Sequence, residues 1–163
     1  MSPWNAEMRS SMLSFWTHTS GCIPKVPPSK GKPPFKLGRR LGGGGFGTVY
    51  EAYEGIDATR KEWAVKHIRT YYHADVEAEA AFHKLFAEEG IGPRLRPHKF
   101  YFRNGIDNYI VMERAHPLVK YITSRSLSAE QLDDVCEQIR NLVRKQVHLD
   151  MLCVDQKPHN MLY

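Results

Sequence analysis

The feature that most constrains how this chain can fold is the glycine-rich stretch Leu41–Tyr50, which reads LGGGGFGTVY. Glycine has no Cβ, so its backbone N–H groups can approach a ligand closely and its φ angle can be positive. Successive free N–H groups in such a turn form a concave site for anions. The stretch therefore predicts a tight turn that either binds a phosphate or simply reverses the chain.

The residues around the glycines distinguish between kinds of phosphate loop. The spacing of Gly42, Gly44 and Gly47 also fits a dinucleotide fingerprint, but that site needs a helix directly after the loop. Here TVYEAY follows, a segment typical of a strand. A P-loop is excluded because no Gly-Lys-Ser or Gly-Lys-Thr follows. A flexible hairpin turn remains the alternative for the loop taken alone.

The sequence on both sides predicts an α+β fold. Five segments have the β-branched and aromatic residues of strands: Phe35–Leu41, Thr48–Tyr53, Glu62–Ile68, His98–Arg103 and Asn108–Glu113. The dipeptide Asn104-Gly105 indicates a hairpin between the last two. A helix is expected over Ala74–Glu89, with one face formed at helical spacing by Val76, Glu79, His83 and Phe86.

The second half of the chain predicts further helices. A short one is expected at Leu118–Ser124, and Ser128–Gln131 has the pattern of a capping box that begins a longer helix. The apolar residues behind this box recur at helical spacing: Leu132, Val135, Cys136, Ile139, Leu142, Val143 and Val147. Such a wide stripe predicts burial against another layer.

Composition limits the class of protein. The chain is 42% hydrophobic and 25% charged, as in globular domains, and it has neither an 18-residue apolar run nor the h-region of a signal peptide. Its three cysteines are widely spaced and odd in number, which favours a reducing compartment. We therefore expect a cytoplasmic or nuclear protein with no membrane span.

The positive charge lies at the front of the chain. Residues 1–50 hold seven cations and one acid, so they carry a charge of +6. The rest of the chain carries −1, which gives the net charge of +5. Residues 1–34 also hold six of the ten prolines, so we expect a basic, extended or disordered tail there. The tail is either a solvated segment or a docking arm for an acidic partner. The aromatic and basic pattern of a specific nucleic-acid module is not present.

The order of two motifs identifies a family resemblance. The run G-x-G-x-x-G-x-V, with Phe46 and Val49, precedes Ala64-Val65-Lys66 on the third expected strand. Together they resemble the glycine-rich loop and the V-A-I-K strand of the eukaryotic protein kinase superfamily, in a Ser/Thr-kinase-like form. The resemblance implies a small lobe at 35–114, with a five-stranded antiparallel sheet and one helix. It implies the first part of a helical large lobe at 115–163.

The resemblance also implies an ATP site. In the family the lysine of the third strand, here Lys66, contacts the α- and β-phosphates and is held by a helix carboxylate. We expect Glu79 in that place, with Glu77 as the alternative, and Met112 as the gatekeeper before a hinge whose backbone binds adenine. The implied ATP-binding residues are Leu41, Gly42, Gly44, Phe46, Gly47, Val49, Ala64, Lys66, Glu79, Met112, Glu113 and Ala115.

A polar loop near the end of the sequence resembles the kinase catalytic loop. Asp155 and Asn160 keep the family spacing of H-R-D-x-x-x-x-N. By resemblance, Asp155 accepts the proton of a protein Ser or Thr hydroxyl, Lys157 neutralises the γ-phosphate and Asn160 holds Mg²⁺. The alternative is an ordinary polar turn after a helix. The histidines and cysteines show no spacing of zinc ligands.

Two departures from the family pattern bear on activity. Cys153-Val154 replaces the His-Arg before the aspartate, and the three residues after Asn160 include no acid, so the Mg²⁺-binding Asp of D-F-G is not in this sequence. We therefore expect a kinase truncated after the catalytic loop that acts on a protein substrate. The alternative is a kinase-like interaction module that binds nucleotide weakly, or mimics a kinase lobe for a kinase-related partner.

Overall fold

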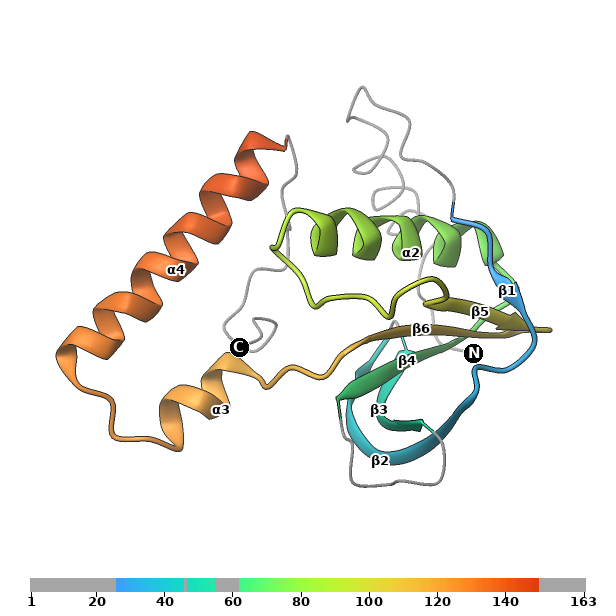
Figure 1. The fold of residues 1–163 in the computed structure, drawn as a ribbon, viewed down its shortest axis with the longest axis horizontal. Helices are drawn as coiled ribbons and strands as arrows, with labels where there is room; N and C mark the ends of the chain where they lie inside the picture. The colour runs from blue at the N-terminus through green and yellow to red at the C-terminus, as the bar shows by residue number, and fades with distance from the viewer. Residues whose placement is uncertain (1–25, 46, 55–61, 150–163) are drawn as a thin grey trace.

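The computed structural model describes residues 26–45, 47–54 and 62–149. Its strands are β1 (Ser29–Lys30), β2 (Phe35–Gly44), β3 (Gly47–Glu54), β4 (Trp63–Arg69), β5 (Tyr101–Asn104) and β6 (Asp107–Glu113). Its helices are α2 (His73–Glu88), α3 (Leu118–Thr123) and α4 (Ala129–His148). The expected α+β class is confirmed. In Figure 1, α2 lies over the sheet, while α3 and α4 lie to one side, beyond the end of β6.

The sheet is mixed and six-stranded, in the order β1-β5-β6-β4-β3-β2. Strands β2 to β6 pair antiparallel, but β1 pairs parallel with β5, with Ser29 opposite Phe102. The predicted five-stranded antiparallel sheet was therefore wrong. The extra strand lies within residues 1–34, where we expected only a tail. It satisfies backbone groups along the open edge of β5, and the Gly31 N–H adds a 2.8 Å bond to the Arg103 carbonyl.

The glycine-rich stretch is mostly strand rather than turn. We expected the first strand to end at Leu41, but β2 continues to Gly44, and Gly42, Gly43 and Gly44 pair with Val49, Thr48 and Gly47 of β3. Backbone pairing needs no side chain, so glycines can continue a strand despite their low propensity. The chain reverses between Gly44 and Gly47, and Gly47 has a φ of +124°.

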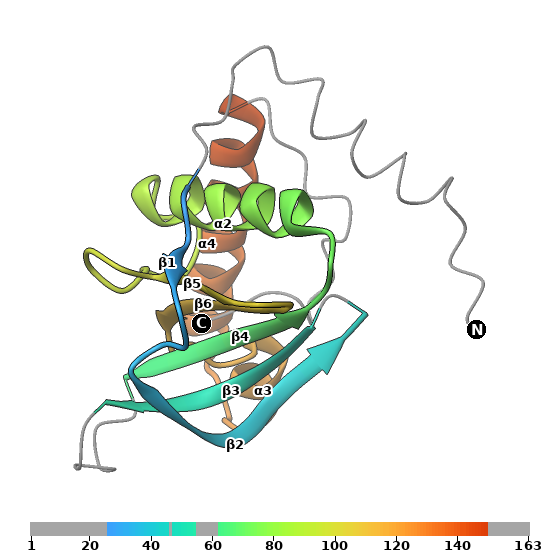
Figure 2. The same ribbon diagram turned by 90° about the vertical axis from the view of Figure 1, so that its right-hand side faces the viewer.

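The core occupies both faces of the sheet because successive strand residues point to opposite sides. On the face beneath α2, Ala64 and its neighbours form one buried cluster: Ala64, Ile68, Val76, Ala80, Tyr101, Ile110 and Met112. On the other face Val65 belongs to a second: Ala52, Val65, Phe102, Tyr109 and Val111. Figure 2 shows α2 along one side of the strands, with β2 forming the edge farthest from it.

Helix α2 was predicted to within one residue at each end. Its buried residues are Val76, Ala80, Ala81 and Phe82. The predicted face was less accurate, because Glu79 and His83 are only partly buried. The two small alanines let the helix approach the sheet closely, and this brings the adjacent Glu79 near the strands.

Helix α4 begins as its sequence predicted. Both hydrogen bonds of the capping box between Ser128 and Gln131 are present. Of the predicted apolar stripe, Val135 is buried, whereas Leu132 is 41% and Val147 is 55% exposed. Burial of the stripe is thus confirmed only in part. None of the described helices has the length and apolar character that crossing a membrane requires.

Candidate functional site

An ion pair between the sheet and α2 forms the centre of the candidate site. The Nζ atom of Lys66, on β4, donates to Oε1 of Glu79 on α2. The two side chains are 19% and 27% exposed, so they are largely shielded from water yet still reachable. The expected partner Glu79 is therefore the one that Lys66 contacts. The alternative, Glu77, pairs instead with Arg103 of β5.

A histidine contacts the same carboxylate oxygen. Nε2 of His83, one turn along α2, lies 3.5 Å from Oε1 of Glu79. Burial raises the pKa of Glu79, but the hydrogen bond from His83 and the charge of Lys66 lower it more, so the net pKa lies below its ordinary value. Glu79 is thus an anion near neutral pH, as a partner for a lysine ammonium must be.

Strand register brings the predicted base-binding residues onto the same face as Lys66. Directly opposed residues on neighbouring strands share a face. Val49, Lys66 and Ile110 form one such row across β3, β4 and β6, and Ala64 stands opposite Met112 in the next row. Leu41 and Val49 pack against the same cluster. On this face of β4, Lys66 lies between Ala64 and Ile68 of the cluster, so an apolar surface carries one lysine.

The glycine-rich hairpin leaves room beside this surface. A Cβ added at Gly42 or Gly44 would meet no atom within 4 Å, so these backbone segments are open to a ligand. Gly47 differs, because a Cβ there would lie 2.5 Å from the carbonyl oxygen of His67. Its role in the described structure is therefore close packing of the hairpin on β4.

The predicted hinge is held by the segment that follows α2. Arg94 forms two hydrogen bonds to the Glu113 carboxylate, at 2.9 and 2.6 Å, and its carbonyl accepts from the Glu113 N–H. The hydrogen bonds from Arg94 lower the pKa of Glu113. Leu95 also bridges to Met112. Because these bonds occupy the Glu113 side chain and N–H, the expected base contacts of the hinge would fall to the Glu113 carbonyl and the Ala115 backbone.

A second buried charge cluster lies on the same sheet. The Glu51 side chain, on β3, is only 3% exposed and contacts Arg39, Arg114 and the Tyr53 hydroxyl. The hydrogen bond from Tyr53 and the two arginine charges lower the pKa of Glu51. Sequence reasoning missed this cluster, since nothing in the spacing of an acid at 51 and arginines at 39 and 114 indicates contact.

Two other contacts were not predicted from the sequence, and only one of them had a local signal. His83 lies four residues after Glu79 on a predicted helix, so an i,i+4 contact was available as a signal. The Arg94–Glu113 pair gave no such signal, because a loop and a strand separate its members.

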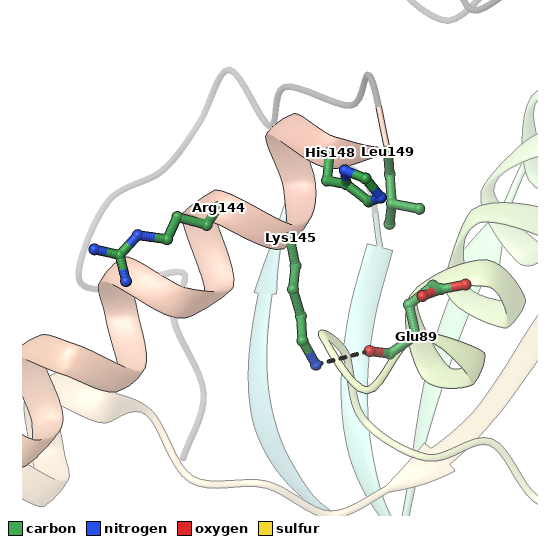
Figure 3. A pocket seen from close by; sticks show the side chains of 5 residues that line it. All are labelled: Glu89, Arg144, Lys145, His148 and Leu149. Atoms are coloured by element: carbon green, nitrogen blue, oxygen red, sulfur yellow. Dashed lines mark hydrogen bonds between the residues drawn. The ribbon is translucent and has the colours of Figure 1, made fainter.

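The described cavities do not coincide with this site. A cavity of about 480 Å³ lies between the ends of α2 and α4 and is lined by Glu89, Arg144, Lys145, His148 and Leu149. Figure 3 shows Lys145 donating to the Glu89 carbonyl while Arg144 points away. No predicted site residue lines this cavity. The Lys66 face is the candidate site because its lysine is paired with a helix carboxylate and strand pairing defines its register.

Several predicted site residues lie outside the described residues. Phe46 of the glycine-rich loop is one, and the whole predicted catalytic loop, Asp155, Lys157 and Asn160, forms the rest. The predicted Mg²⁺ contact through Asn160 therefore stays a prediction. Within the described ranges, no three His, Cys, Asp or Glu side chains gather as metal ligands.

Neither the protein-family models nor the curated proteins compared with this chain give a significant match. The site must therefore be interpreted from its own geometry.

Proposed function

We propose that this protein binds ATP in the manner of a protein kinase, with the glycine-rich β2–β3 hairpin over the phosphates and Lys66 on the α- and β-phosphates. The observation that carries the proposal is the ion pair between Lys66 and Glu79. A carboxylate on a helix that holds a strand lysine beside a glycine-rich hairpin is the arrangement that kinase phosphate binding requires.

The chemistry of the surroundings supports the same ligand. A lysine ammonium is a compact point charge that suits phosphate oxygens. The apolar surface of Leu41, Val49, Ala64 and Met112 suits a flat base, because most ligand pockets combine apolar walls with a few polar groups. ATP has both an aromatic base and a chain of phosphates, and it fits both parts.

Titration calorimetry of the full chain with ATP and Mg²⁺ tests the proposal. We expect wild-type protein to bind and Lys66→Ala to bind at least about tenfold more weakly, since a charge-assisted contact contributes roughly 1.5 kcal/mol or more. Lys84→Ala is the matched control, because Lys84 forms only an exposed pair with Glu88 on α2. An absence of binding to wild-type protein, or equal binding by Lys66→Ala, would refute the proposal.

We propose in addition that the chain transfers the γ-phosphoryl group to protein Ser or Thr hydroxyls. The support is the spacing of Asp155, Lys157 and Asn160, with Asp155 accepting the hydroxyl proton and Asn160 holding Mg²⁺. Transfer of labelled phosphate to a generic basic protein should require both Lys66 and Asp155. A signal that survives Asp155→Ala would come from a contaminating kinase.

The second candidate is a kinase-like module that binds nucleotide and acts through a protein partner. The observation in its favour is the exposure of Leu132 and Val147 on α4, since apolar residues on a helix surface are available to a partner. ATP binding that depends on Lys66, without transfer that depends on Asp155, would favour this candidate over the enzyme.

A further inference from the structure

We propose that Glu51 is a positioning residue that sets the adenine end of the nucleotide site by tying the glycine-rich hairpin to the segment after β6. This inference rests on the proposed ATP binding and goes beyond it. The resemblance to kinases assigns no role to Glu51.

The contacts of Glu51 join three parts of the chain. Its Oε1 atom lies 3.1 Å from Nη2 of Arg39, on β2, and 3.1 Å from Nη2 of Arg114, the residue that follows β6. Its Oε2 atom accepts a 2.7 Å bond from the hydroxyl of Tyr53 on β3. Both carboxylate oxygens are therefore satisfied, and each partner comes from a different place in the sequence.

Burial makes this arrangement specific. The Glu51 side chain is 3% exposed and that of Arg114 is 16% exposed, whereas Arg39 is 72% exposed. A buried carboxylate is costly unless charged or hydrogen-bonding partners surround it, so losing the contact with Arg114 or Tyr53 carries the larger penalty and the exposed Arg39 adds less. Local packing also fixes the position of Tyr53. A Cβ at Gly38 would lie 2.1 Å from the Tyr53 ring, so the ring lies directly against the backbone of β2. The glycine thus allows Tyr53 to reach Glu51.

Register places this cluster at the base end of the site rather than the phosphate end. Glu51 is opposite Ala64, which is opposite Met112, so the three residues form one row across the sheet. Lys66 belongs to the next row, with Val49, which is closer to the turn of the hairpin. The Lys66 ammonium therefore lies toward the phosphate end of the proposed site, and the Glu51 row lies at the base end, with Ala64 and Met112.

The consequence is a fixed distance between two walls of the site. Arg39 belongs to the strand that carries the hairpin, and Arg114 belongs to the predicted hinge. Glu51 holds both guanidinium groups on one oxygen. When the carboxylate charge is lost, the hairpin strand and the hinge are no longer held at one spacing, and the base loses its fit.

Adenosine and ATP separate this role from that of Lys66. Calorimetry on the full chain should show that Glu51→Gln lowers the affinities for adenosine and for ATP by the same factor. We expect a factor of roughly ten, a typical coupling between sites. Lys66→Ala should lower the affinity for ATP and leave the affinity for adenosine unchanged. Glu137→Gln is the matched control, because Glu137 also lies between two arginines, Arg140 and Arg144, but on α4. It should change neither affinity.

The outcomes are distinct. Wild-type protein that binds neither ligand refutes the proposed function, and this inference with it. If wild-type protein binds and Glu51→Gln keeps the wild-type affinity for adenosine, only the inference is overturned, even when the variant unfolds at a lower temperature. If Glu51→Gln does not fold, Tyr53→Phe takes its place. Tyr53→Phe should lower the affinity for both ligands equally, by about twofold to fivefold. An unchanged affinity for adenosine would overturn the inference.

Discussion

At the scale of single residues, the candidate site depends on one carboxylate oxygen that a lysine and a histidine side chain share. Oε1 of Glu79 contacts both Lys66 and His83. Because these contacts lower the pKa of Glu79 in the folded chain, the unfolded chain binds a proton more readily there. The Glu79 charge therefore stabilises the folded chain. This stabilisation is fully present above the unfolded-state pKa and is lost as pH falls through the folded-state pKa.

We predict that Glu79→Gln lowers the free energy of unfolding by at least about 1 kcal/mol at neutral pH. The difference from wild type should shrink as pH falls from about 7 to about 3, because wild-type Glu79 then becomes protonated and resembles glutamine. Urea unfolding at several pH values measures this. A difference that stays constant over the range would contradict the role of the charge.

Two glycines of the hairpin should respond differently to alanine. Gly47 has a positive φ and no room for a Cβ, so Gly47→Ala should destabilise the fold by roughly 1–3 kcal/mol. Gly42→Ala is the control, because it lacks both features and should change stability by less than about 1 kcal/mol. Thermal unfolding of both variants provides the comparison, and equal losses would show that Gly47 is not specially constrained.

At the scale of elements, long periodic segments could be predicted and short ones could not. Helix α2 and the β5–β6 hairpin follow from helical spacing and from Asn104-Gly105, which are local signals. Strand β1 has two residues, too few for any period, and forms only because an edge of β5 is available. The strand predicted over His98–Arg103 begins three residues later, as β5 at Tyr101, because His98 adopts a φ of +66° and cannot continue a strand.

The residues of the candidate site likewise include some that local sequence signals predict and some that they do not. Lys66 could be found because a motif fixes its strand, and Glu79 because it lies on a helix face. Glu51 could not, because its partners meet it only through strand pairing and a register shift between Leu37 and Arg40 of β2. Gly38 lies within this shift, but a glycine in a strand does not indicate which side chains the shift brings together.

The capping box of α4 gives a prediction at this scale. Ser128→Ala removes the bond that the Gln131 N–H donates to the serine hydroxyl, so it should destabilise α4 by about 1 kcal/mol. Ser126→Ala, outside the helix, is the control. Amide exchange along α4 reports the loss, and equal exchange in the two variants would mean that the cap does not limit helix opening.

At the scale of the whole molecule, α2 connects the separate parts of the site. It supplies Glu79 to Lys66 and Glu77 to Arg103, and the carbonyl of Glu89, the residue that follows it, accepts from Lys145 of α4. A shift of this one helix would therefore change the contacts of both the sheet and α4. Changes on α4 near Lys145 are expected to reach the Lys66–Glu79 pair through α2.

Strand β1 determines the order in which the fold is completed. Its partner β5 follows it only after β2, β3, β4 and α2, so the pairing closes a very long loop. Loop closure of this kind is entropically late and is favoured only after the intervening strands have formed. We predict that the Gly31 amide, bonded to Arg103, exchanges with solvent sooner than the amides of central strand β4.

Hydrogen exchange followed by NMR measures this difference residue by residue. Equal protection at Gly31 and in β4 would mean that β1 opens only with the whole domain. In kinetic terms, we expect the two-residue strand to pair last and to separate first. We therefore expect the folded sheet to release Ser29–Lys30 at little cost while β2 to β6 stay paired.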